Sequence, residues 1–272
     1  MKRYRHYQKD KAIVLAGFGS VIEQQMYLDL QKEIKAAFEG VDVFLSFSSR
    51  MVLKHLEKEG KTYRNLPQVL ADIDRAGYRH VVVASINLFP TDEHELLKRM
   101  VEGFGMFSPA NIRLTKAIMH KTKETSLALA ELNDTISDPV WANLYIIHGV
   151  PVLDLGGLEA VGYADGLLRR IGERNYTCSL EGAYPYYALK NALIGEMKRD
   201  GITHVQIVPL LLVSGNHYRK DMMEITEELG EHFQTRIVPP LGKSERFNLL
   251  ELESIRAIIR QNIQDEITKL GC

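Results

Sequence analysis

Three side chains that bind metals and accept protons follow short apolar runs in the second half of the chain. His148 ends the run 144–147, Glu181 follows 176–180, and His217 comes soon after 203–212. Imidazole and carboxylate groups bind divalent transition metals, and an imidazole accepts a proton near neutral pH. Because ligands of parallel α/β sheets lie outside the carboxyl ends of the strands, these residues predict a metal site of two histidines and one carboxylate.

Each residue also has an ordinary structural interpretation. His148 can be a hydrogen-bonded histidine at a strand end, Glu181 a solvated turn carboxylate, and His217 a polar loop residue before a helix. Their occurrence on successive strand ends favours function, so the prediction depends on the fold. His80 and His204 begin strands at the opposite edge of the sheets and are expected to be structural.

The loop after the first-half strand 80–86 contains one more candidate, His94. It lies in the acidic segment 92–95, which also fits the first turn of a helix, where the helix dipole favours carboxylates. Helix capping and metal handling are both open for this segment.

Apolar strand runs alternate with amphipathic helical segments along the whole chain. The runs are 11–16, 41–47, 80–86 and 112–117 in the first half, and 144–147, 176–180, 203–212 and 236–239 in the second. Segments 76–83 and 200–207 share one pattern, in which a glycine ends a helix and a histidine follows before a buried run. Continuous apolar strands are typical of parallel sheets covered on both faces.

The fold prediction is therefore α/β, with two similar domains in tandem and a cleft between them. Each domain is expected to be a parallel sheet flanked by helices, the first covering residues 1–135 and the second, with the metal site, residues 136–272. Residues 250–270 predict a long amphipathic helix that packs back on the N-terminal domain.

Composition excludes several classes of function. The net charge of -1 gives no basic field for nucleic acid or anionic membranes, and no stretch is apolar enough to cross a bilayer. The two cysteines exclude a cysteine zinc cluster and favour a reducing, cytoplasmic setting. The segment 17–22 lacks the third glycine of a dinucleotide fingerprint, and the segment 237–244 lacks the first glycine of a phosphate loop.

Several motifs together resemble one enzyme family. They are Gly17-Phe18-Gly19-Ser20, Phe47-Ser48-Ser49, Asp92-Glu93-His94-Glu95, Ile147-His148-Gly149, Leu180-Glu181-Gly182-Ala183-Tyr184-Pro185, and Leu210 to His217 with Asp221-Met222. Taken together, these motifs make the chain resemble the anaerobic-type sirohydrochlorin cobaltochelatases of the class II chelatase group. The resemblance extends over nearly the whole chain. The chain departs from the family pattern in places. The segment between Glu181 and Tyr184 is one residue longer, and Asn87 stands where relatives can carry histidine. Ala16-Gly17 replaces a version that contains serine, and Arg50 replaces a small residue.

The resemblance implies insertion of a divalent metal into sirohydrochlorin in anaerobic cobalamin synthesis. It places His148, Glu181 and His217 at the metal, with His148 as chief base and Glu181 as a second ligand or proton acceptor. The ring would lie in the cleft and meet Gly17, Phe18, Gly19, Ser20, Ser48, Ser49 and Glu93. Cobalt is the metal implied by the family, whereas the ligands alone also suit Fe²⁺, Ni²⁺ and Zn²⁺.

No organic cofactor is expected. Alternatives left open are an iron or nickel chelatase acting on a related tetrapyrrole, and a protein that binds metal or tetrapyrrole without catalysis. The sequence does not decide whether the longer segment keeps Glu181 as a ligand, and it leaves a homo-oligomer open.

Overall fold

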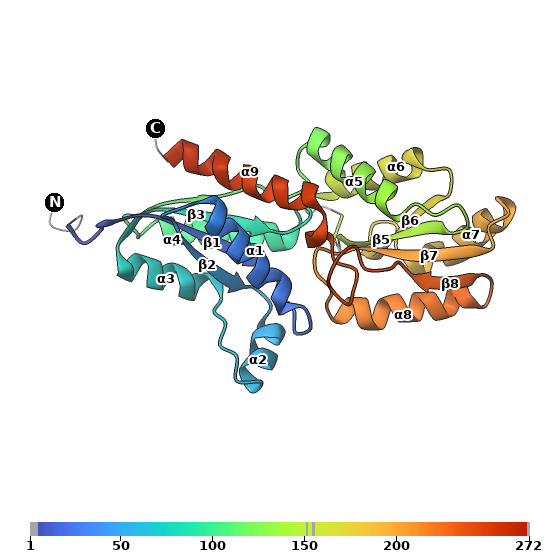
Figure 1. Ribbon diagram of the computed structural model, residues 1–272, viewed down its shortest axis with the longest axis horizontal. Coiled ribbons are helices and arrows are strands. Elements are labelled where there is room, and N and C mark those ends of the chain that lie inside the picture. Colours follow the sequence, from blue (N-terminus) through green and yellow to red (C-terminus); the bar gives the residue numbers. More distant parts are fainter. Residues whose placement is uncertain (1–4, 151, 154–155, 271–272) are drawn as a thin grey trace. The chain divides into compact units, whose positions relative to one another are not determined.

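The chain folds into two compact units. The computed structural model describes residues 5–150, 152–153 and 156–270, apart from the side chains of residues 216–219. One unit comprises Met1–Ile118 with Arg256–Cys272, and the other comprises Met119–Ile255 (Figure 1). The boundary expected between residues 135 and 136 falls at the end of α5 (Thr122–Ile136), a helix that belongs to the second unit.

The first unit is built on a four-stranded parallel sheet in the order β2-β1-β3-β4. Its elements are β1 (Lys9–Gly17), α1 (Gln24–Ala37), β2 (Asp42–Phe47), α2 (Arg50–Lys58), α3 (Leu66–Ala76), β3 (Tyr78–Ile86), α4 (Asp92–Gly105) and β4 (Asn111–Leu114). Helix α3 begins as its sequence predicts: Asn65 and Gln68 form a capping box, and Gly77 ends the helix with φ 77°.

Helices cover both faces of this sheet. Ala12, Val14 and Ala16 of β1 pack with apolar residues of α3 and α4 in one buried cluster. The alternate residues, Ile13 and Leu15, point to the other face and are also fully buried. Because both faces of the sheet are buried, its strands have continuous apolar sequences rather than alternating apolar and polar residues.

The C-terminal helix α9 (Glu253–Leu270) is anchored to the first unit by ion pairs. Arg113 Nε of β4 donates to Glu266 Oε2 over 2.7 Å, and Arg260 pairs with Glu33 of α1. The predicted long C-terminal helix is therefore present, and it begins three residues later than expected because Leu249–Glu251 form a short 3₁₀ helix.

The second unit repeats the sheet order of the first, as β6-β5-β7-β8, again all parallel. Its elements are α5, β5 (Ala142–Val150), α6 (Leu158–Ile171), β6 (Asn175–Gly182), α7 (Tyr186–Arg199), β7 (His204–Leu210), α8 (Asn216–Gly230) and β8 (Gln234–Ile237). Leu144 and Ile146 pack with apolar residues of α7 and α8. Tyr145 points to the opposite face and donates to Asn133 of α5 over 3.0 Å.

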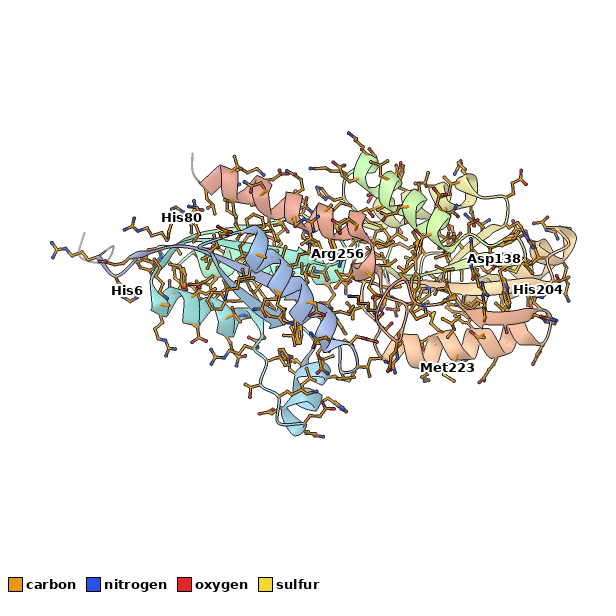
Figure 2. All side chains as sticks on the ribbon, viewed as in Figure 1. His6, His80, Asp138, His204, Met223 and Arg256 are labelled. Carbon is orange, nitrogen blue, oxygen red and sulfur yellow. The ribbon has the colours of Figure 1, made fainter. Side chains whose placement is uncertain are left out.

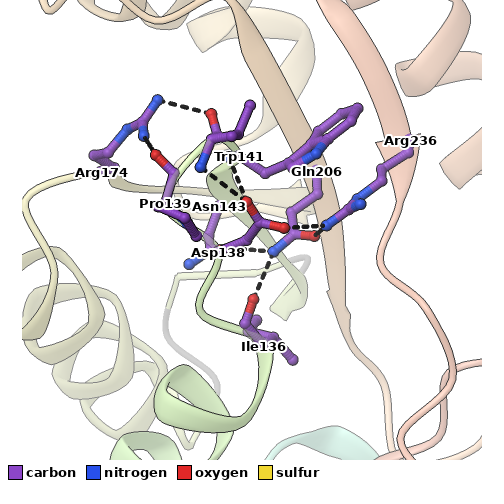
Figure 3. Close-up of polar contacts among 9 residues, drawn as sticks. Ile136, Asp138, Pro139, Trp141, Asn143, Arg174, Gln206 and Arg236 are labelled. Atoms are coloured by element: carbon purple, nitrogen blue, oxygen red, sulfur yellow. Dashed lines mark hydrogen bonds and ion pairs between the residues drawn. The ribbon is translucent and has the colours of Figure 1, made fainter.

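A buried polar network ties the amino ends of this second sheet together (Figure 3). Gln206 of β7, with no exposed surface, donates to the carbonyl of Ile136 and to Asn143, and accepts from Arg236 of β8. Arg236 also contacts Asp138 and lies over the ring of Trp141. Since every partner here is hydrogen-bonded, the network fixes α5 and three strands in one arrangement.

The two histidines expected to be structural occupy matching positions. His80 lies near the start of β3, and His204 begins β7 (Figure 2). The neighbouring strands β1 and β5 match as well. Lys11 of β1 is opposite His80, and Trp141, just before β5, is at the level of His204, because Ala142 pairs with Val205. The prediction of two similar parallel α/β halves is confirmed.

Candidate active site

His148 and Glu181 lie on neighbouring strands of the second unit, β5 and β6. The sequence predicted that these strands end at residues 147 and 180, and this is wrong: β5 continues through His148 to Val150, and β6 through Glu181 to Gly182. Pairing continues as well, with Ile147 opposite Ser179 and Gly149 opposite Glu181. Both candidate side chains are thus positioned by a paired sheet rather than by free loops.

Two glycines make this continued pairing feasible. Gly149 has φ 94° and Gly182 has φ 77°, in the left-handed region that disfavours other residues. A Cβ atom on Gly149 would overlap the carbonyl oxygen of Glu181, and one on Gly182 would overlap the carbonyl oxygen of Val150. The backbones of β5 and β6 therefore approach each other at these two positions more closely than residues with a Cβ atom would allow.

The side chains of His148 and Glu181 face each other. Nδ1 of His148 lies 3.7 Å from Oε1 of Glu181, and the two side chains are 45% and 53% exposed. Such a pair forms an ion pair when the imidazole is protonated. Neutral imidazole and carboxylate are both groups that can bind a divalent metal or accept a proton.

The pair opens into a pocket of about 440 Å³ between α7 and α8. His148 continues the sheet face of Leu144 and Ile146, which packs on these helices. The pocket is lined by His148, Leu180, Glu181, Tyr186, Tyr187, Lys190, Asp221, Glu224, Ile225 and Glu228.

The lining of this pocket is strongly acidic. It contains four carboxylates and one lysine, and Lys190 Nζ lies 2.9 Å from Glu228 Oε2. Clefts lined by one sign of charge concentrate ions of the opposite sign, so the pocket attracts cations.

Two tyrosines, Tyr186 and Tyr187, also line the pocket. Tyr187 is 79% exposed, whereas Tyr186 is buried and its hydroxyl faces the carboxylate of Glu228. Burial raises the pKa of Tyr186, and the charge of Glu228 raises it further. Its hydroxyl therefore stays protonated at neutral pH.

The sequence did not single out Tyr186, Lys190, Glu224 and Glu228. One signal was available: Asp221, Glu224 and Glu228 are spaced three and four residues apart, which puts them on one stripe of a helix.

The third predicted ligand, His217, lies in the first turn of α8, not in the loop before a helix. Its side chain is outside the described residues, so its approach to His148 stays a prediction. Within the side chains that the structure does describe, no three His, Cys, Asp or Glu residues gather closely enough to hold a metal ion.

The predicted ring-binding residues of the first unit lie at the carboxyl ends of β1 and β2 and at the start of α4. The backbone N–H groups of Ser48 and Ser49 donate to the carbonyls of Gly17 and Phe18. These contacts bring the β1 and β2 loops together. The side chain of Phe18 is 43% exposed beside them.

Several of these residues also have local roles. Ser20 accepts hydrogen bonds from the N–H groups of Ile22 and Glu23, and Ser49 caps α2 by accepting from Val52. The N–H of Gly19 donates to the hydroxyl of Tyr27 over 3.3 Å. These polar groups of the predicted ring-binding residues are therefore already hydrogen-bonded within the protein.

Glu93 is the ionisable member of this group. Ser48 Oγ donates to Glu93 Oε2 over 3.0 Å, and burial raises the pKa of the Glu93 carboxyl despite this hydrogen bond. Ser48 and Glu93 therefore form a polar pair at the carboxyl edge of the first sheet.

His94 is not on a helix surface but buried behind this edge. Its Nδ1 lies 2.8 Å from Ser85 Oγ, which also accepts from Asn87 Nδ2. Ser85 therefore joins the two candidate positions His94 and Asn87 in one hydrogen-bonded group.

Comparison with known proteins identifies the family. A sequence model described as cobalt chelatase (CbiK) matches residues 11–260. The chain belongs to the cobalt chelatase family. The resemblance expected from its motifs, and with it a chelatase enzyme acting on a metal substrate, is confirmed.

Curated cobalt chelatases are similar over most of their length. The sirohydrochlorin cobaltochelatase of Salmonella typhimurium is 23% identical over 216 residues, covering 78% of this chain and 80% of the relative. The sirohydrochlorin cobaltochelatase CbiKC of Nitratidesulfovibrio vulgaris is 27% identical over 219 residues, covering 78% and 75%.

A solved chelatase structure shares the fold. SirB from Bacillus subtilis, determined with Fe³⁺, superposes with a TM-score of 0.67 at 18% identity, covering 96% of this chain and 97% of SirB. No described helix of this cobalt chelatase family member could cross a membrane.

Proposed function

We propose that the protein inserts a divalent metal, Co²⁺, into sirohydrochlorin. The observation that carries this proposal is the facing pair of His148 and Glu181 at the head of an acidic pocket. Family membership and the names of the curated relatives support the choice of metal and ring. The preference of protein ligands among first-row metals does not favour cobalt, so the metal rests on the family alone.

The reaction exchanges one divalent cation for two pyrrole protons. His148 acts as chief base and as a ligand, Glu181 as a second ligand or proton acceptor, and His217 as the third ligand. Neutral imidazole and carboxylate can release a bound metal to a better chelator as the ring nitrogens lose their protons. Because the oxidation state of the metal does not change, the reaction needs no organic cofactor.

The ring is bound by the first unit. Exposed Phe18 offers an aromatic surface to a planar ring, and the neighbouring residues Gly17, Gly19, Ser20, Ser48 and Ser49 are small enough to let the ring approach. Glu93, whose pKa burial raises, can share a proton with a substrate carboxylate. We expect a cytoplasmic protein, and its oligomeric state stays undecided.

Metal insertion assayed by absorbance under anaerobic conditions tests the proposal. Sirohydrochlorin is mixed with Co²⁺, Fe²⁺ or Ni²⁺ and the wild type, His148→Ala or Glu181→Gln. We expect the fastest catalysed insertion with Co²⁺ and a loss of about 100-fold or more in His148→Ala, typical of a lost general base.

Three results would change the proposal. Faster insertion of iron or nickel would assign another metal. Binding of the ring without acceleration by the wild type would indicate a protein that does not catalyse. Full activity of His148→Ala would refute the mechanism.

A further inference from the structure

The segment that follows Glu181 folds back on Ser179. The N–H of Ser179 donates to the carbonyl oxygen of Tyr184 over 2.9 Å, and Ser179 pairs with Pro185 in an isolated bridge. Residues 179–185 therefore form a tight reversal: the end of β6, which carries Glu181, is followed by a turn that returns to Ser179.

The hydroxyl of Ser179 donates to two backbone carbonyls of the segment that follows it. Its oxygen lies 2.9 Å from the carbonyl oxygen of Glu181 and 2.7 Å from that of Ala183, so its single hydrogen is shared between the two. Ser179 is 2% exposed. A hydroxyl so deeply buried needs such partners, and its loss would remove the side-chain hydrogen bonds that the carbonyls of Glu181 and Ala183 accept.

The loop holds a backbone conformation that other contacts must support. Tyr184 has φ 60°, the left-handed region, which costs a residue with a side chain about 1–2 kcal/mol. Gly182, one residue past Glu181, has φ 77°. Without hydrogen bonds across the loop, these residues would relax, and the carboxylate of Glu181 would move with them.

We propose that Ser179 is a positioning residue that holds the Glu181 carboxylate toward His148. It acts through the backbone carbonyls on both sides of Gly182 and touches neither metal nor ring. This inference rests on the proposed function in one respect: its consequence is read as affinity for the metal.

A double-mutant cycle tests whether Ser179 acts through Glu181. Ser179→Ala, Glu181→Gln and the double variant are compared with the wild type, with Co²⁺ alone as the probe for the dissociation constant. The KM values for Co²⁺ and for sirohydrochlorin are measured separately. Thr177→Val is the matched control, because Thr177 lies two residues earlier on the same face of β6 and its hydroxyl is also buried and hydrogen-bonded.

We expect Ser179→Ala to weaken Co²⁺ binding about tenfold and to raise the KM for Co²⁺ similarly, as is typical when a residue supporting a ligand is removed. The KM for the ring should not change. In the Glu181→Gln background the same substitution should have no further effect on Co²⁺ binding, because two residues that act as one unit are not additive. Thr177→Val should lower thermal stability without changing Co²⁺ affinity.

Two results would overturn the inference alone: a Ser179→Ala variant with wild-type Co²⁺ affinity beside an impaired Glu181→Gln, or equal effects of Ser179→Ala in both backgrounds. Wild-type metal affinity in Glu181→Gln itself would instead remove Glu181 from the proposed function, and the positioning role with it.

Discussion

Gly149 lies directly opposite Glu181 in the parallel pairing of β5 with β6. The carbonyl oxygen of Glu181 occupies the space that a side chain on Gly149 would need. The distance between His148 and Glu181 therefore depends on a backbone contact that only glycine permits.

Gly149→Ala should destabilise the protein more than an alanine at another left-handed glycine. Gly201 is the control, since it has φ 70° and open space around its Cα. We expect about 1–2 kcal/mol for Gly201→Ala, and for Gly149→Ala about 1–3 kcal/mol more from steric overlap. Urea denaturation measures both, and equal losses would contradict the close contact.

Lys190→Gln should strengthen metal binding. The substitution removes the lysine that pairs with Glu228, the single lysine among the described residues that line the pocket. At low ionic strength we expect the KM for Co²⁺ to fall about two- to fivefold, and the difference to vanish near 1 M salt, where charges are screened. Lys198→Gln changes the net charge equally from the far end of α7, so an equal fall there would argue against a local effect.

Glu93→Gln should change the pH dependence of stability. Because burial raises the pKa of Glu93, the folded protein binds its proton up to a higher pH than the unfolded chain does. The raised pKa lowers the free energy of unfolding only where the two states differ in protonation. At low pH both states are protonated and nothing is lost. Once the pH exceeds the pKa in the folded protein, the loss has its full size.

The melting temperatures of the wild type and Glu93→Gln should therefore agree near about pH 4 and diverge toward about pH 7, with the variant more stable. Ser48→Ala removes the hydrogen bond that lowers this pKa, so it should widen the pH-dependent loss when Glu93 is present and not in the Glu93→Gln background. A constant gap between wild type and Glu93→Gln at all pH values would exclude this explanation.

Gln206→Leu should destabilise the second unit strongly. The change leaves Asn143, Arg236 and the carbonyl of Ile136 without this partner in a buried site. We expect a loss of about 2–4 kcal/mol, from one to two unsatisfied buried groups. Gln234→Leu, on the exposed start of β8, should change stability by less than about 0.5 kcal/mol. Similar losses at both positions would show that the network does not act as described.

The sequence predicted elements whose signals are local. The cap at Asn65 and the stop at Gly77 are where their residue types indicate. The apolar runs also located all eight strands. These features depend on neighbours within a few residues along the chain, which a single sequence displays.

The ends of β5 and β6 could not be predicted from local sequence signals. His148, Gly149 and Glu181 have no strand propensity, and they continue the sheet only because each strand pairs with the other. The longer segment after Glu181 is accommodated by Tyr184 at φ 60°, a conformation that its residue type does not indicate. The acidic pocket likewise requires α7 to lie beside α8, which depends on packing across the sheet.

A left-handed glycine occurs at the same position in both halves, two residues past the end of β1 in the first and within the last residues of β5 in the second. When His80 is matched with His204, the strand registers match Gly19, with φ 93°, to Gly149, with φ 94°, and hence Phe18 to His148. A repeated backbone thus carries an aromatic ring in one copy and an imidazole in the other. Because a phenyl ring has no lone pair for a metal ion or a proton, the two halves cannot perform the same chemistry at this shared backbone position.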